Sequence, residues 1–98
     1  MVTYEVTTTV RIDLVPEYER YMIDRHIPEL LATGAFIGAS FSRSTAGRYR
    51  IRYEAEDQKA LDRYLVEHAS RLRAQVQEKF GDGVQLTREE WTVLEHWP

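Results

Sequence analysis

The feature that most constrains the fold is an alternation of apolar and polar residues from Val2 to Ile12. Its apolar side consists of Val2, Tyr4, Val6, Val10 and Ile12, interrupted by Thr8. Its polar side consists of Thr3, Glu5, Thr7, Thr9 and Arg11. Successive side chains of a β-strand point to opposite faces, so the pattern predicts a strand that is buried on one face only.

A helix with a break follows this strand. Pro16 suits the first helical position, because the N–H that it lacks would have no partner there. The inward stripe of the helix consists of Tyr18, Met22 and His26, at four-residue spacing. Pro28 cannot donate to the carbonyl one turn earlier, so we expect a kink or break near Arg25 to Ile27 and a short second turn from Pro28 to Ala32. Gly34 is the predicted left-handed C-cap.

The rest of the chain combines three strands with a second helix. We predict strands from Phe36 to Arg43 and from Arg48 to Glu54, joined by a hairpin turn. One continuous helix is expected from Glu56 to Phe80. Its apolar stripe consists of Leu61, Tyr64, Leu65, His68, Leu72 and Val76. A last strand covers Val84 to Val93, and the polar run from Thr87 to Glu90 within it is a bulge or an exposed segment.

The order strand, helix, strand, strand, helix, strand predicts the fold. Each helix links two parallel, non-adjacent strands through a right-handed crossover. The result is an α+β fold, a ferredoxin-like βαββαβ plait, with a four-stranded antiparallel sheet and two helices on one face. The opposite face carries Arg48, Arg50 and Arg52 beside Glu5 and the threonines of the first strand. Such a face needs solvent, a ligand or another subunit.

The composition limits the domain count and the chemistry. A length of 98 residues suits one domain, spanning residues 1–98. The absence of cysteine excludes disulfides and thiol nucleophiles, and the absence of asparagine excludes mechanisms that need its amide. The chain lacks a long apolar run and a signal-peptide pattern, so a cytoplasmic location is the default expectation. A formal net charge of -3 gives no general attraction to nucleic acid or to anionic membranes.

Several segments together resemble a small bacterial family of uncharacterised proteins. These segments are Met22 to Phe36, the Tyr-Arg-Ile-Arg-Tyr strand, and His68 to Arg73. The family is grouped with the dimeric α+β barrel superfamily, so the resemblance implies a homodimer in which two sheets face each other. That superfamily includes cofactor-independent monooxygenases of antibiotic biosynthesis, small-molecule isomerases and haem-degrading enzymes, which rely on an Asn that this chain lacks. The resemblance carries no catalytic residues over to this chain.

The two histidines on the inward stripes are candidates for chemistry. His26 would be a general base or a ligand contact beside a cavity between helix and sheet, because imidazole changes charge near neutral pH. In the structural alternative, His26 hydrogen-bonds to carbonyls that the helix break leaves free. His68 would share a polar pocket with His26 or be a hydrogen-bonded core residue. No third ligand accompanies them, so the sequence predicts neither a metal site nor a cofactor.

Tyrosines supply the remaining candidates. The predicted ligand-binding residues around His26 are Tyr18, Tyr21, Tyr53, Tyr64 and His68. An aromatic pocket with a few polar groups would suit a planar small molecule. The simpler account of the same tyrosines is core packing, with each hydroxyl reaching a partner or the surface.

The arginine-rich third strand raises the alternative of an RNA-binding plait. RNA-recognition modules of this strand order stack bases on aromatic residues of the open sheet face. Here Tyr49 and Tyr53 point inward, so no nucleic-acid partner is expected. The open face is predicted instead to pair with a second copy of the chain. Candidate aromatic anchors for that interface are Phe41, Trp91 and Trp97.

Two functional classes remain open. In the first, the protein is a homodimer that binds a small molecule in a His- and Tyr-lined pocket between helices and sheet. In the second, it is an enzyme of the cofactor-independent monooxygenase or isomerase kind, with His26 as the base. The inward His and Tyr residues favour an enzyme, whereas the absence of paired acid and base groups favours a binding protein.

Overall fold

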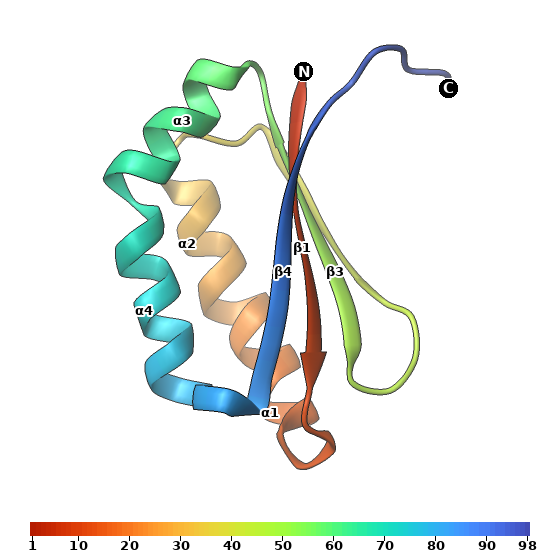
Figure 1. Ribbon diagram of the computed structural model, residues 1–98, viewed down its shortest axis with the longest axis vertical. Helices are drawn as coiled ribbons and strands as arrows, with labels where there is room; N and C mark the ends of the chain where they lie inside the picture. The colour runs from red at the N-terminus through yellow and green to blue at the C-terminus, as the bar shows by residue number, and fades with distance from the viewer.

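The first strand lies in the middle of a four-stranded antiparallel sheet with the order β2-β3-β1-β4. The strands are β1 (Val2–Val10), β2 (Gly38–Arg43), β3 (Arg48–Ala55) and β4 (Val84–Thr92). The computed structural model describes residues 1 to 98 and places every helix on one face of this sheet (Figure 1). The predicted ferredoxin-like α+β fold is therefore confirmed.

The pairing of β1 with β4 runs without interruption from Val2 opposite Thr92 to Val10 opposite Val84. A bulge in the polar run Thr87 to Glu90 is therefore wrong, and the alternative of an exposed segment is correct. These residues are polar because β4 is an edge strand whose outer half no helix covers. Alternation continues through them, which keeps Leu86 and Arg88 on the helix side of the sheet.

The end of β1 differs from the prediction. The strand stops at Val10, and Ile12 is 65% exposed in a short 3₁₀ turn, Ile12–Leu14. The Val10 N–H donates to the Gly47 carbonyl at 2.7 Å. Gly47 has a φ of +81°, and a Cβ there would lie 2.7 Å from the Val10 carbonyl oxygen. The close approach of the hairpin turn, which only glycine permits, thus fixes where β1 ends.

The irregularity predicted near Arg25 to Ile27 is present as a π-helical segment, although the chain stays helical and does not break. Helix α1 (Val15–Tyr21) continues through a π-helical segment, Met22–His26, into α2 (Ile27–Ala32). In the π segment the Ile27 N–H donates to the Met22 carbonyl, five residues back. This wider turn places Pro28 in the first turn of α2, where its missing N–H is tolerated. The predicted left-handed Gly34 is confirmed, with a φ of +81°.

The predicted second helix is two helices. Helix α3 (Gln58–Glu67) ends where His68 leaves the helical region, at φ −128° and ψ −32°, and α4 (Ala69–Phe80) begins at the next residue. The buried positions change phase here, because Ala69 is buried and His68 is only partly buried. The predicted continuous helix would have placed His68 on its inward face. At the junction between α3 and α4 it is only partly buried instead.

Aromatic rings fill the core between the sheet and the helices. The ring of Phe36 lies 5.0 Å from that of Tyr64 and 5.1 Å from that of Tyr53 between centroids. Phe41 packs 6.2 Å from Tyr18, on the helix side of the sheet, so it is not an anchor on the open face. None of the helices combines the length and the apolar character of a membrane span.

Candidate functional site

A cavity of about 440 Å³ lies between the sheet and the helices and opens between α4 and β4. Its inner wall consists of apolar and aromatic side chains, among them Tyr4, Val6, Met22, Leu30, Ile51 and Val84. Val6 faces the helices from the central strand yet is only partly buried, because the cavity leaves it uncovered. A cavity of this size suits a small organic molecule.

His26 lines the cavity from the end of the π segment. Its Nδ1 is buried and has no hydrogen-bond partner, so the imidazole does not satisfy a helix carbonyl through this atom. Burial lowers the pKa of His26 to about 4 against the opposing effect of Glu29, with a smaller contribution from the nearby Arg88 in the same direction as burial. The ring is therefore neutral at pH 7 and presents an unpaired nitrogen.

Three predicted tyrosines line the cavity with His26, namely Tyr18, Tyr53 and Tyr64. The Tyr18 hydroxyl is hydrogen-bonded to the Thr8 hydroxyl at 3.0 Å, and burial raises the pKa of Tyr18 to about 12. Burial also raises the pKa values of Tyr53 and Tyr64. No hydrogen bond joins the hydroxyls of Tyr53 or Tyr64 to another group of the chain, in contrast to those of Tyr4, Tyr18 and Tyr49.

The other two predicted residues lie outside the cavity wall. Tyr21 packs behind His26, with 6.1 Å between the ring centroids, and under the ammonium of Lys79. His68 lies at the junction of α3 and α4, where its ring packs 6.3 Å from that of Tyr64. The His68 Nδ1 lies 3.4 Å from the Arg71 Nη2. The structure thus brings His26 together with three of the four tyrosines but not with His68.

Two arginines at the cavity were missed from the sequence. Arg73 comes from α4 and Arg88 comes from β4, and no Asp or Glu lines the cavity with them. Alternation from Val84 through Leu86 indicates that Arg88 faces the helices. Arg73 lies four residues after Ala69, on the same side of α4. Both spacing patterns were present in the sequence. They were passed over because a charged residue in a polar segment is usually interpreted as exposed to solvent.

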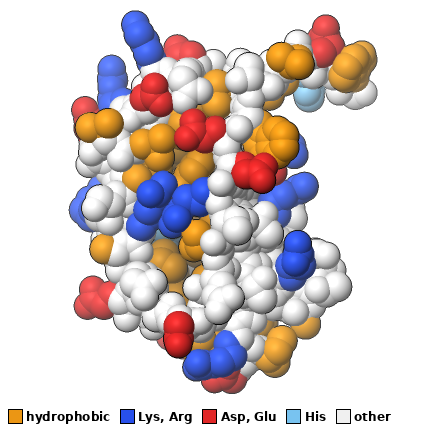
Figure 2. All heavy atoms as spheres, in the orientation of Figure 1, with side chains coloured by type: hydrophobic (Ala, Val, Ile, Leu, Met, Phe, Trp, Pro, Cys, Tyr) orange, Lys and Arg blue, Asp and Glu red, His pale blue; other side chains and the backbone are white.

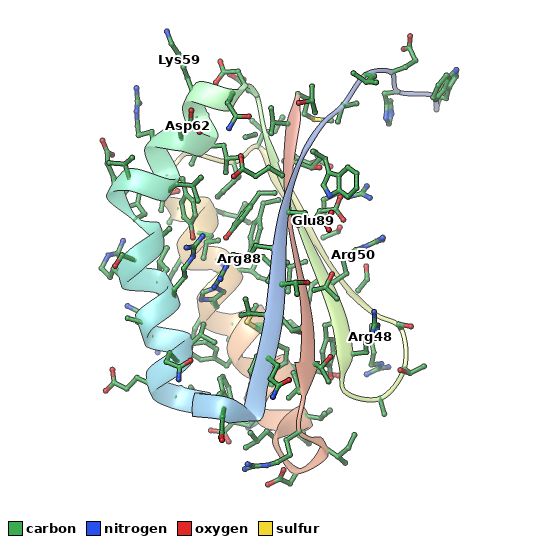
Figure 3. The ribbon with its side chains drawn as sticks, viewed as in Figure 1. Arg48, Arg50, Lys59, Asp62, Arg88 and Glu89 are labelled. Atoms are coloured by element: carbon green, nitrogen blue, oxygen red, sulfur yellow. The ribbon has the colours of Figure 1, made fainter.

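Cationic side chains gather over apolar ones between α4 and β4 (Figure 2). The Arg73 Nη2 donates to the Tyr4 hydroxyl at 2.9 Å, while its Nε is buried without a partner. Arg88 extends from β4 toward the helices (Figure 3). The site therefore combines an aromatic interior with a cationic entrance.

The fold and the cavity together define an α+β protein of the ferredoxin-like class with a potential binding site between its two layers. Residues 1–96 match the family described as "Domain of unknown function (DUF4286)", and the chain belongs to this family. None of the curated protein sequences matches the chain.

Solved structures of similar fold include several enzymes. A mutant of SnoaB, a cofactor-independent oxygenase from Streptomyces nogalater, has a TM-score of 0.81 at 17% identity, covering 99% of this chain and 96% of that chain. MhuD with two manganese protoporphyrin IX bound per active site has a TM-score of 0.75 at 16% identity, covering 100% and 99%. A dimeric ferredoxin-like protein from an uncultured marine organism has a TM-score of 0.71 at 10% identity, covering 98% and 96%. These identities are low, so the likeness concerns the fold.

Proposed function

We propose that this protein binds a small ring-containing molecule in the cavity between its sheet and helices. The observation that carries the proposal is a set of unpartnered polar groups in an otherwise apolar wall. These groups are the Nδ1 of His26, which is buried, and the hydroxyls of Tyr53 and Tyr64, two cavity-lining residues whose side chains form no hydrogen bond within the chain. Buried polar groups normally have hydrogen-bond partners, and a bound ligand would supply them.

A nuclear magnetic resonance titration with a panel of aromatic fragments tests the proposal. Backbone amide shifts are expected to cluster at residues of the cavity wall. Ala74→Trp, at an exposed position of the cavity entrance on α4, would fill the opening and abolish these shifts. Ala32→Trp, exposed at the end of α2 and outside the cavity, is the matched control and leaves them intact. Shifts that are absent, or that persist in Ala74→Trp, would refute the proposal.

A cofactor-independent oxygenase or isomerase is the second candidate function. The specific observation in its favour is the neutral His26. Its unpaired Nδ1 can accept a proton from an acidic C–H or a phenol O–H of a bound molecule. Against it, a pKa of about 4 makes His26 a weak base at pH 7, because an effective base has a pKa near the working pH. Oxygen uptake with easily oxidised phenols, lost in His26→Gln, would support catalysis. Uptake that is unchanged in that variant would exclude His26 as the base.

We also propose that two copies pair through the open face of the sheet. Trp91 is 52% exposed on this face, and the segment after β4 projects on the same side with Leu94 and Trp97 exposed (Figure 1). Arg48 and Arg50 point away from the helices, as does Glu89 farther along the sheet (Figure 3). None of these three side chains forms an ion pair within the chain. In a two-fold arrangement, the arginines of one copy can face the glutamate of the other.

A further inference from the structure

Two arginines at the cavity entrance have no acidic partner. Arg73 and Arg88 form none of the salt bridges of the chain, although Asp and Glu together number 16. The acidic residue nearest along β4 on the same face is Glu90, and its carboxylate accepts a hydrogen bond from Gln58 at 3.0 Å. The protein is acidic overall, yet no carboxylate pairs with Arg73 or Arg88 at the cavity entrance.

The two arginines reach this entrance from opposite sides. Arg88 lies opposite Val6 in the sheet, so it shares the helix-facing side with the cavity floor. Arg73 is partly buried on α4 and is oriented by its hydrogen bond to Tyr4. The positive charges of Arg73, Arg88 and the neighbouring Arg71 all lower the pKa of Tyr64 against the raising effect of burial. Arg73 and Arg88 line the same cavity, so they repel each other, and an anion between them would offset that repulsion.

The ordinary behaviour of surface arginines does not explain why Arg73 lies at the cavity. Arginine often covers apolar surface with its aliphatic stem while its charged head reaches water. The Nε of Arg73, however, is buried and lacks a hydrogen-bond partner. A buried donor of a charged group that is left unpaired loses its hydration without compensation. Arg73 is therefore not a freely solvated side chain, and its charge lies at the cavity wall.

We propose that the cavity binds aromatic carboxylates, with the carboxylate between Arg73 and Arg88 and the ring beside Tyr53, Tyr64 and Val6. This inference rests on the proposed function as a small-molecule binder. Guanidinium and carboxylate are both planar and form paired hydrogen bonds, which gives strong and directional recognition. A singly charged head group suits two arginines above an apolar cavity better than a phosphate dianion, whose desolvation costs more.

Isothermal titration calorimetry with 2-naphthoate and its neutral amide, 2-naphthamide, tests the inference. The two probes share one ring system and differ in charge. We expect 2-naphthoate to bind about 10- to 100-fold more tightly, as is typical of hydrogen bonds to a charged group. Arg88→Gln is the decisive variant, because Arg88 is exposed and forms no contact on which the fold depends. It should remove most of the preference, and Arg73→Gln should do the same.

Arg63→Gln is the matched control, because Arg63 is exposed on α3 and does not line the cavity. This variant keeps the preference for 2-naphthoate. Equal affinity for the two probes would overturn the inference while leaving a neutral-ligand pocket, and thus the proposed function, in place. A preference that survives both cavity variants, or tighter binding of 2-naphthyl phosphate than of 2-naphthoate, would also overturn it. Failure to bind either naphthalene probe would refute aromatic carboxylates as the ligand class, while the fragment panel judges the pocket separately.

Discussion

The imidazole of His26 is kept neutral by its surroundings. Burial lowers its pKa from 6.5 to about 4, the guanidinium of Arg88 contributes in the same direction, and the carboxylate of Glu29 opposes both. The group packed behind it is the ring of Tyr21. A neutral, partly buried imidazole can donate or accept a hydrogen bond, which suits ligand recognition better than proton transfer at pH 7.

This lowered pKa predicts a pH-dependent stability. Between pH 6.5 and 4 the unfolded chain protonates His26 and the folded chain does not, so the free energy of unfolding falls as the pH falls through this window. The loss approaches about 3 kcal/mol at pH 4, since each pKa unit corresponds to about 1.4 kcal/mol. Urea unfolding at several pH values should show a flatter profile for His26→Gln than for the wild type.

The control for this measurement is His96→Gln, whose side chain lies in the exposed C-terminal segment. Its stability profile should follow that of the wild type. If His26→Gln loses stability with acid as steeply as the wild type, then the imidazole is not the group responsible.

The hydrogen bond between Thr8 and Tyr18 is a second test at the scale of residues. Both side chains are almost fully buried, at 2% and 1% exposure. Thr8→Val leaves the Tyr18 hydroxyl without its partner, and we expect a loss of about 1–3 kcal/mol in chemical unfolding. The double variant Thr8→Val with Tyr18→Phe removes both groups and should recover much of this loss. If the loss of unfolding free energy in the double variant equals the sum of the losses in Thr8→Val and Tyr18→Phe, the hydrogen bond contributes nothing.

The sequence identifies the residues of the cavity more easily than the cavity itself. Four-residue spacing places Tyr18, Met22 and His26 on one inward stripe, and all three line the cavity. The empty space depends on how far α4 stands from β4, and no short-range pattern encodes that separation. Arg88 was missed for this reason. A polar segment of an edge strand looks the same in the sequence whether it faces open solvent or the entrance of a cavity.

At the scale of elements, the helices show how proline and burial can mislead. Pro28 predicts a kink or break, and the helix instead accommodates it with a π turn that removes the need for the missing N–H. The apolar stripe through His68 predicts no break, yet α3 and α4 separate there, because the backbone of His68 leaves the helical region. Strand alternation was more reliable, because the strands pair without a bulge and so keep their period of two residues throughout.

The start of α3 gives a prediction for an element. The Asp57 carboxylate accepts a hydrogen bond from the Ala60 N–H at 2.9 Å, so Asp57 is the N-cap. Asp57→Ala should lower the free energy of unfolding by about 1 kcal/mol, because that N–H then loses its partner. Lys59→Ala, an exposed position in the same first turn of α3 whose side chain makes no capping hydrogen bond, is the control and should change stability little. Urea denaturation of the two variants measures the difference, and equal stabilities would exclude the cap.

At the scale of the whole molecule, the proposed dimer predicts a change in mass on altering one tryptophan. Sedimentation velocity should give a dimer for the wild type at micromolar concentration. Trp91→Glu places a charge on the open face, in place of its large exposed aromatic side chain, and should weaken association at least about 10-fold. Val66→Glu changes an even more exposed apolar residue, but on α3 and away from that face, and should remain dimeric. A wild type that sediments as a monomer would exclude the dimer.

The place of β1 in the sheet has a consequence for biosynthesis. Strand β1 precedes the other strands along the chain and lies inside the sheet, whereas its partner β4 is the last of the four strands to be made. Val2 pairs with Thr92, so these hydrogen bonds wait until the intervening strands and helices have been made. Such distant pairings favour folding in milliseconds to seconds rather than microseconds. During synthesis β1 has open edges that can pair with another nascent chain, which makes this strand the natural target of a chaperone.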